Sequence, residues 1–413
     1  MWLKADGSRF HEWEKQYGPI VGLKFGPQNV VVLNSYKAVK ELFDKRGAIY
    51  SSRPDSYVGN ELLCPNAAHI LLVPYGQEWR ALRKAVQALL SVTAVDALLP
   101  VQEVEASQSL FEIMENPTKA FTSIRRYSTA VILASVFGQR GVSYESPKVQ
   151  ALYHAQEQFT EILAPGATPP VDAFPFLRYI PSLLTPYKSR AARIRHEQRT
   201  LYSSLLDETK TRMHKPDKIP CFMDKLLGSQ EKSGLNADQL MYTGGILAIM
   251  TETLRWRPVA PGGIPHMLIQ DDIYNGYFLP KGTIVFANTW SIHQDTSEYE
   301  MPDEFIPERF LTNKFGSRGA KDDSTDNDQR RVTYTFGAGR RMINMAKITW
   351  AFTISADLSL PPPDTDVKSG YSDGFVLGPK SFSASFAVRS PQHREVIEKE
   401  FQQAKTFFRK YED

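Results

Sequence analysis

The sequence predicts a mainly helical fold with a small β-region, and three features of its 413 residues support this prediction. Between about Val101 and Leu247, apolar residues recur with the period of an α-helix. After Arg257 the sequence pattern changes to short runs of β-branched and aromatic residues separated by turn residues. With 42% hydrophobic and 11% aromatic residues, the chain has enough apolar side chains for a substantial core.

The helical pattern is clearest in three segments, VQEVEASQSLFEIM (101–114), VQALYHAQEQFTEIL (149–163) and HEQRTLYSSLLDETKTRM (196–213). Between the second and the third lies PGATPPVDAFPFLRYIPSLLTPY (165–187). Its prolines forbid a continuous helix, because proline lacks a backbone N–H and clashes with the preceding turn. We therefore expect an ordered loop between two helices.

The β-region is predicted from MLIQDDIYNGYFLPKGTIVFAN (267–288). Asn275-Gly276 is a hairpin signal, and Pro280-Lys281-Gly282 marks a second turn between strand-like flanks. The polar run SRGAKDDSTDNDQRR (317–331) reads as a solvated surface loop.

Charge and cysteine content exclude several classes of protein. The 49 basic and 46 acidic side chains leave a net charge of +3, too small to indicate nucleic acid as the main partner. Only Cys64 and Cys221 are present, so a disulfide framework and a cysteine-rich zinc site are excluded, and each is most simply a small buried apolar residue. Because no stretch approaches the roughly 20 apolar residues of a membrane helix, we expect no membrane span in this chain.

Two arginine motifs lie far apart in the sequence. In ETLRWRP, Glu252 and Arg255 stand on one face of a helix that should end before Pro258. Taken alone, this spacing is most often a surface ion pair of little energetic value. Further on, DEFIPERF contains Arg309, whose guanidinium fork could join the two segments through paired hydrogen bonds to a carboxylate.

A glycine loop, FGAGRR (336–341), places two arginines before a helix, a geometry suited to an anionic group. A dinucleotide-binding loop is disfavoured, because Met342 occupies the position of the third glycine and SADLSLPPPDTD follows with its prolines. A zinc hydrolase is also disfavoured, since none of the eight histidines belongs to an H-E-x-x-H pair.

These motifs occur in a diagnostic order: Glu252-x-x-Arg255, RPVAPGGIPH, YFLPKGTIVFANTWSIHQD, Pro307-Glu308-Arg309-Phe310 and FGAGRR. YGQEWRALRK precedes them and FAVRSPQHREVIEKEF follows. The chain resembles the cytochrome P-450 family of haem-thiolate monooxygenases, most closely the fungal members from specialised metabolism. The resemblance covers nearly the whole chain and implies a single, incomplete cytochrome P-450-like domain over residues 1–413.

The resemblance also assigns roles to individual residues. Glu252, Arg255 and Arg309 match a structural triad near the proximal side of the haem. The positions that match haem-propionate contacts are Trp79, Arg83, His266 and Arg341, and Phe336 matches the aromatic residue beside the haem sulfur. Guanidinium and indole N–H groups suit carboxylates because they are donors. For His266, an ordinary strand histidine remains an equal alternative.

The resemblance fails at the metal ligand. The family's ligand cysteine stands two residues after the second arginine of the glycine loop, and Ile343 occupies that position here. Asn344 and Met345 do not match the following turn either, and Cys64 and Cys221 lie elsewhere in the family pattern. No catalytic residue and no metal ligand can therefore be identified. The loss removes the thiolate that favours oxygen–oxygen cleavage at a haem iron.

A second departure lies in the central helix. LNADQLMYTGGILAIM (235–250) resembles its start, yet Met250 runs directly into Thr251 where an oxygen-activating stretch is expected. We infer internal deletions near 248–251 and 342–344. The family is usually anchored in the endoplasmic-reticulum membrane, but FHEWEKQYGPIVGLKFGP already resembles the segment after that anchor, so none is expected here.

The resemblance implies a haem monooxygenase of fungal secondary metabolism. Such an enzyme hydroxylates an apolar small molecule with dioxygen and electrons from an NADPH-dependent reductase. By analogy, the substrate would lie between the haem and the proline-rich loop near Pro169–Pro181. The alternative is a catalytically inactive remnant, or an incomplete gene model, of such an enzyme.

Overall fold

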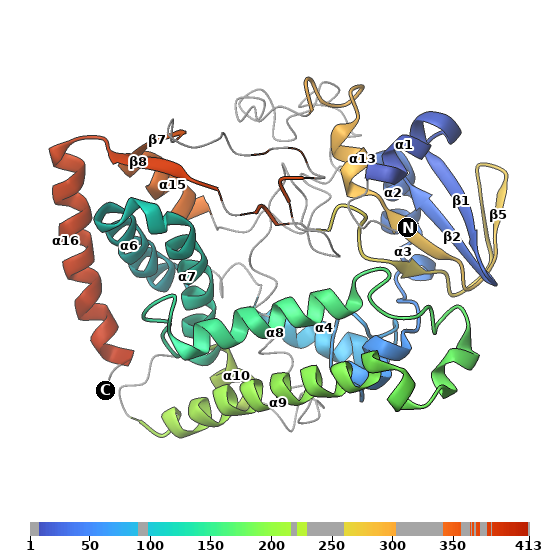
Figure 1. The fold of residues 1–413 in the computed structure, drawn as a ribbon, viewed down its shortest axis with the longest axis horizontal. Helices are drawn as coiled ribbons and strands as arrows, with labels where there is room; N and C mark the ends of the chain where they lie inside the picture. Colours follow the sequence, from blue (N-terminus) through green and yellow to red (C-terminus); the bar gives the residue numbers. More distant parts are fainter. Residues whose placement is uncertain are drawn as a thin grey trace.

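The computed structural model describes residues 8–89, 98–215, 221–228, 260–302, 342–356 and 382–411, with short stretches at 364, 366, 369–371 and 378–380. Within them, helices dominate and a small β-region lies at one side (Figure 1). The predicted mainly helical fold with a small β-region is confirmed.

The α-helices of the described part are α1 (Ser8–Tyr17), α2 (Tyr36–Val39), α3 (Gly47–Tyr50), α4 (Gln77–Leu89), α6 (Leu99–Glu115), α7 (Ala120–Ile132), α8 (Pro147–Leu163), α9 (Pro186–Arg212), α10 (Phe222–Gly228), α13 (Thr289–Gln294), α15 (Met342–Ala351) and α16 (Pro391–Phe408). The π-helical turns are η1 (Lys40–Lys45), η2 (Tyr57–Leu63) and η4 (Leu133–Phe137), and the 3-10 turns are η3 (Pro117–Lys119), η5 (Pro175–Tyr179), η6 (Ser182–Leu184) and η7 (Arg409–Tyr411).

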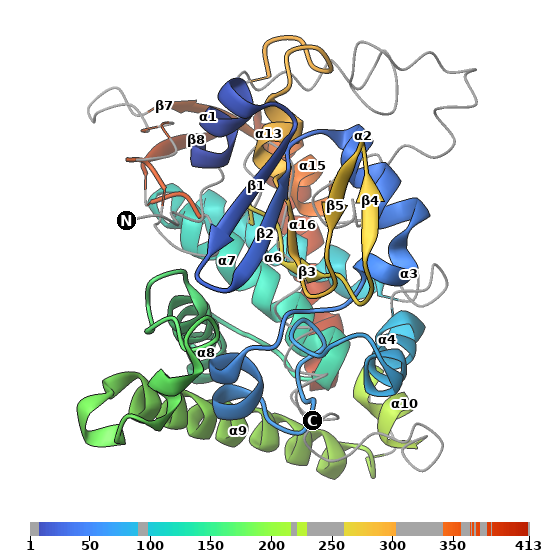
Figure 2. The same ribbon diagram turned by 90° about the vertical axis from the view of Figure 1, so that its right-hand side faces the viewer.

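The strands are β1 (Ile20–Phe25), β2 (Gln28–Leu33), β3 (His266–Met267), β4 (Asp272–Tyr274), β5 (Tyr277–Leu279), β6 (Ile284–Ala287), β7 (Phe352–Ala356) and β8 (Ala384–Val388). A four-stranded sheet has the order β1-β2-β6-β3, so β2, near the start of the chain, pairs with the distant β6, with Val30 opposite Ile284. In this sheet β2 and β6 run parallel and the other pairs run antiparallel. Figure 2 shows this sheet with the hairpin β4-β5 beside it.

The three helical segments predicted from periodicity are confirmed as α6, α8 and α9. The proline-rich segment between α8 and α9 is an ordered loop, with η5 and η6 as its only regular turns. Each of α6, α8 and α9 has a proline in its first turn, where the missing N–H has no intrahelical partner to lose.

The predicted hairpin is confirmed as β4-β5, which pair antiparallel around Asn275-Gly276. Both turn residues have positive φ, 49° and 81°, which is the backbone that a two-residue hairpin turn of this hand requires. Gly282 has a φ of 83° at the second predicted turn, immediately before β6.

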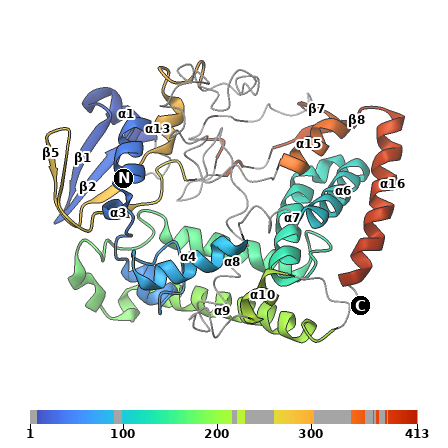
Figure 3. The same ribbon diagram turned by 180° about the vertical axis from the view of Figure 1, so that it is seen from behind.

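The hydrophobic core consists of several separate clusters. The largest cluster joins α4, η4, α8, α9 and α10 with the segment after η2, as seen from behind in Figure 3. A second cluster lies under the four-stranded sheet, between β2 or β6 and the helices α2 and α3. A third joins α6, α15, α16 and the strands β7 and β8.

One buried charge cluster joins α6 and α7, next to the third hydrophobic cluster. Arg126 of α7 is 1% exposed and donates to Glu105 of α6 at 2.6 Å and to Glu112 at 2.9 Å. Burial alone would lower the pKa of Arg126, but the two carboxylates outweigh it and leave the pKa raised. A buried arginine of this kind is tolerated because its donors are satisfied.

No helix in the described part of the chain is long and apolar enough to cross a membrane. The predicted triad of Glu252, Arg255 and Arg309 lies outside the described residues, as do Phe336, Arg341 and the polar run 317–331. Cys64 and Cys221 are both buried and form no disulfide, as the sequence predicts.

Candidate functional site

Trp79 and Arg83 lie four residues apart on α4, so they share one face of the helix. Trp79 is half-buried, and its ring packs against Tyr75 with 5.2 Å between ring centroids. Arg83 is exposed and makes no hydrogen bond or ion pair with the residues that the structure describes. Its guanidinium is therefore available for an anionic partner.

His266 lies in β3 and is held from two sides. Its Nδ1–H donates to the carbonyl oxygen of Tyr50 at 2.8 Å, and its ring stacks on Phe43 with centroids 4.4 Å apart. The hydrogen bond fixes the proton on Nδ1, because a carbonyl oxygen only accepts. The ring orientation of His266 is thus set by the fold.

The segment from Tyr50 to Arg53 brings α4 and β3 together. The backbone N–H of Met267 donates to the carbonyl of Ser52 at 2.9 Å, beside His266. On the other side, the N–H of Tyr75 donates to Oγ of Ser52 at 3.2 Å, and Tyr75 in turn packs on Trp79. The structure therefore assembles Trp79 and His266 around one connecting segment.

Arg53 ends this connecting segment, although no sequence pattern singles it out. Its Nη1 donates to the carbonyl of Pro265 at 2.9 Å, while its buried Nε has no hydrogen-bond partner. Burial lowers the pKa of Arg53 to about 10, and no carboxylate of the described residues counters that effect. A buried guanidinium without a counter-ion is costly, so it favours binding of an anionic group. We name Arg53, Trp79 and Arg83 the donor cluster, and His266 lies beside it with its Nδ1–H already donated to Tyr50.

Comparison with known proteins identifies the family to which the chain belongs. The family model described as cytochrome P450 matches residues 4–249 and 245–342. The chain belongs to the cytochrome P-450 family. Its relatives include the cytochrome P-450 monooxygenase yanC of Aspergillus niger, 31% identical over 96% of this chain and 88% of that protein. The monooxygenase patH of Penicillium expansum is 32% identical over 95% of this chain and 87% of its own length.

The fold agrees with this assignment. A zebra fish cytochrome P-450, solved with progesterone, superposes with a TM-score of 0.70 over 92% of this chain and 99% of that chain at 21% identity. The predicted cytochrome P-450 fold is confirmed. By family and relatives, the protein is a cytochrome P-450-type monooxygenase similar to those of fungal secondary metabolism, and the family implies a haem cofactor.

One end of a haem suits the described residues. The propionates of haem are carboxylates, and the donor cluster offers a buried, unpartnered Nε on Arg53 and an unpaired guanidinium on Arg83. The indole N–H of a half-buried Trp79 is a further donor of the same kind. The donor cluster therefore fits the carboxylate edge of the cofactor.

The iron-ligand end of a cytochrome P-450 does not fit the described residues. Helix α15 already begins at Met342, so Ile343 lies within the helix where the family has a ligand loop. The chain's thiols lie elsewhere: Cys64 is in the core, and burial raises the pKa of Cys221 to about 11. In the part of the chain that the structure describes, no group of three or more histidine, cysteine or acidic side chains could hold a metal ion.

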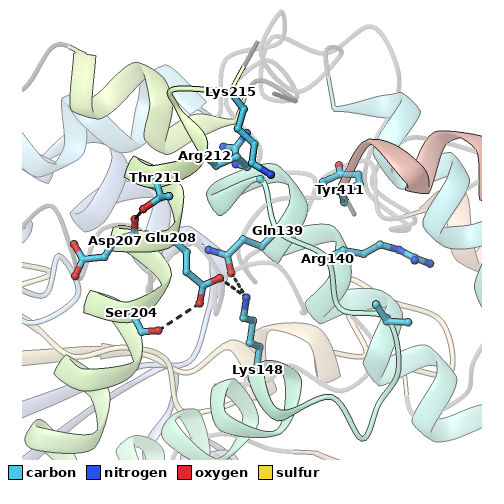
Figure 4. Close-up of a pocket in the computed structure, with 12 residues that line it drawn as sticks. Gln139, Arg140, Lys148, Ser204, Asp207, Glu208, Thr211, Arg212, Lys215 and Tyr411 are labelled. Atoms are coloured by element: carbon cyan, nitrogen blue, oxygen red, sulfur yellow. Dashed lines mark hydrogen bonds and ion pairs between the residues drawn. The ribbon is translucent and has the colours of Figure 1, made fainter. Parts of the chain in front are cut away.

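An open groove of about 610 Å³ lies away from the donor cluster, where α9, the start of α8 and Tyr411 meet (Figure 4). Lys148 crosses it to Glu208 and donates to Gln139 at 2.9 Å. None of the donor-cluster residues lines this groove, so it is separate from the predicted cofactor site.

Proposed function

We propose that this cytochrome P-450 oxidises an apolar or partly oxidised small molecule in fungal secondary metabolism, with electrons supplied by an NADPH-dependent reductase. The observation that carries the proposal is the donor cluster, because the half-buried Arg53 has a buried Nε and no carboxylate partner among the described residues, which is unfavourable unless an anionic cofactor edge is placed beside it. Haem, when bound, supplies the oxygen chemistry, and the protein supplies orientation and exclusion of water.

Within this proposal the donor cluster holds the haem propionates. Arg53 and Arg83 provide guanidinium donors, Trp79 provides its indole N–H, and His266 lines the same edge from β3. Arg341 and Phe336 would complete the cofactor contacts, and Glu252, Arg255 and Arg309 would form the structural triad. The whole chain would act as one domain.

We further propose that two internal segments of the family are absent from this chain. The alignment with the A. niger protein extends over 477 residues, longer than the 413 residues of the chain, so it includes internal positions that have no residue here. The two matches to the family model meet at 245–249 and the second ends at 342, next to the junctions inferred from the sequence. The start of α15 at Met342 supports the second junction.

On this account, the chain as written is not catalytically competent, because it offers no cysteine at the ligand position. The alternative is that the shortened chain is a remnant with no monooxygenase activity in any form. Sequencing of the transcript across Leu247–Glu252 and Arg341–Asn344 separates the two. A longer reading frame with a cysteine after Arg341 supports the enzyme, and a transcript identical to this sequence supports the remnant.

The role of the donor cluster is tested in a chain with both segments restored from the A. niger relative. We expect Arg53→Met and Arg83→Met each to weaken haem retention during gel filtration, because each removes a charge-assisted hydrogen bond to a carboxylate. Arg193→Met is the matched control, since Arg193 is exposed on α9 away from the cluster. Equal haem retention in all three variants would contradict the proposed role.

A further inference from the structure

Helix α15 is held at its end by the C-terminal segment of the chain. The backbone N–H of Arg389 donates to the carbonyl of Ala351 at 3.1 Å, and its Nε donates to the carbonyl of Thr349 at 3.1 Å. The last carbonyl groups of a helix have no partner within the helix, so Arg389 satisfies two of them. The end of α15 is therefore fixed by the residue that follows β8.

Helix α16 packs against α6 through one apolar stripe. Ile397, Ala404 and Phe408 are buried, and Phe401 stacks on Phe111 of α6 with ring centroids 4.1 Å and planes 17° apart. Along α16 these positions recur at intervals of four, three and four residues, the spacing that keeps side chains on one face of a helix. Apolar packing therefore fixes where α16 stands, independently of its charged side chains.

Glu400 lies beside this stripe and joins α16 to both neighbouring helices. Its Oε2 accepts hydrogen bonds from Nζ of Lys347 on α15 at 2.5 Å and from Oγ of Ser107 on α6 at 3.0 Å. Ser107 is buried and Lys347 is half-buried, and the Nζ of Lys347 also lies 3.3 Å from Oγ of Ser107. By contrast, the exposed Glu398 pairs with Arg394 of its own helix at 3.6 Å. One carboxylate of α16 thus links α15 to α6.

We propose that Glu400 is a positioning residue for the haem ligand and acts through Lys347 and α15. This inference rests on the proposed function, under which the ligand loop of the complete enzyme leads directly into α15. Lys347 stands four residues after Ile343, about 6 Å along the helix axis, so a shift of α15 along α6 moves the ligand with it. A misplacement of about 1 Å is large for a reacting group. The apolar stripe holds α16, and Glu400 transmits that position to α15.

The hold of Glu400 on α15 is tested in the full chain as it exists, by hydrogen–deuterium exchange of the α15 amides read by mass spectrometry. Glu400→Gln keeps the shape of the side chain and removes its charge, so exchange in α15 should become roughly two- to fivefold faster, the effect of one partly exposed ion pair. Lys347→Met should have the same effect, and the double variant should add nothing further. Glu398→Gln, two residues away on α16, is the matched control and should leave exchange in α15 at the wild-type rate.

The effect on the ligand is tested in the chain with both segments restored, from the ratio of thiolate-ligated to thiolate-free haem in the reduced carbon-monoxide spectrum. Glu400→Gln should lower this ratio roughly two- to fivefold at equal haem content, because the ligand loop is held less firmly. A mere loss of overall stability would lower the haem content and leave the ratio unchanged. Exchange of the two partners, Lys347→Glu with Glu400→Lys, should restore the ratio, and Glu398→Gln should not change it.

The two proposals fail separately. An unchanged exchange rate in Glu400→Gln, an unchanged ratio in restored Glu400→Gln, or equal changes in Glu398→Gln would overturn the positioning role and leave the proposed function standing. No thiolate band from the restored chain itself would contradict the proposed function. The exchange rates would then decide alone whether Glu400 holds α15.

Discussion

The Tyr50–Arg53 edge of the β-region and the start of α15 retain very different shares of a haem site. At the first, separate segments converge, and the guanidinium groups of Arg53 and Arg83 have no carboxylate partner within the described part of the chain. At the second, a helix begins directly at Met342, and under the proposed function Ile343 stands where the family has its ligand cysteine. The comparison teaches that the residues that hold the cofactor edge depend on the sheet, whereas the ligand depends on one short segment that can be lost alone.

The largest predicted effect tests whether α6 and α7, which pack beside α15, are folded as described despite the missing ligand. Arg126→Met should reduce the free energy of unfolding by about 3–5 kcal/mol, because the buried carboxylate of Glu105 would lose its close hydrogen-bonded partner and keep only Arg140, at 3.8 Å. Urea denaturation followed by circular dichroism measures the change.

A paired variant sharpens this test. Arg126→Met combined with Glu105→Leu removes the two fully buried charges and should recover part of the lost stability, since the remaining carboxylate, Glu112, is partly exposed to solvent. Arg193→Met, at an exposed position, is the control. A loss below about 1 kcal/mol for Arg126→Met alone would mean that α6 and α7 are not packed as described.

The next prediction concerns His69, a buried histidine in the segment that precedes α4. The folded-state pKa of His69 is depressed to about 3 by burial, so its stabilising contribution is present above the unfolded pKa near 6.5. That contribution is lost as the pH falls toward 3. Between pH 7.5 and pH 5 the wild type should therefore lose about 2 kcal/mol that His69→Phe does not lose.

Urea unfolding at the two pH values gives this difference directly. His196→Gln is the matched control, because His196 is exposed and its replacement should leave the pH dependence of the wild type unchanged. An identical pH dependence in the wild type and His69→Phe would show that His69 is solvated in the folded chain.

The smallest predicted effect concerns Ala67 in the same segment, which has a left-handed φ of 55°. Ala67→Gly should raise the free energy of unfolding by about 0.5–1 kcal/mol, because glycine removes the cost of a left-handed φ and returns only part of it as unfolded-state entropy. Ala192→Gly, in the exposed interior of α9, should instead destabilise by a similar amount. A destabilised Ala67→Gly would show that this backbone conformation is not strained.

Periodicity and turn chemistry predicted much of the fold. The helices α6, α8 and α9, the proline-rich loop and the hairpin at Asn275-Gly276 depend on local signals, and each is confirmed. The parallel pairing of β2 with β6 could not be predicted in this way, because strands so distant in sequence pair through tertiary packing.

The site was predictable only in part. The structure brings Trp79 and His266 toward one segment, and Arg83 follows Trp79 on α4, while the haem-contact roles assigned by resemblance stay predictions. Arg53 was missed because a single arginine before a proline has no periodic or motif signal, and its importance comes from burial and a missing counter-ion.

The central claim is that this chain keeps the cofactor-edge donors but lacks the ligand and central segments. The most direct test is the reduced carbon-monoxide difference spectrum of haem-supplied wild type, Ile343→Cys and the chain with both segments restored. We predict the long-wavelength Soret band of a thiolate-ligated haem only in the restored chain. In Ile343→Cys the new sulfur would lie in α15, without the loop whose N–H groups tune such a ligand. A thiolate band from the wild type, or from Ile343→Cys alone, would contradict the account.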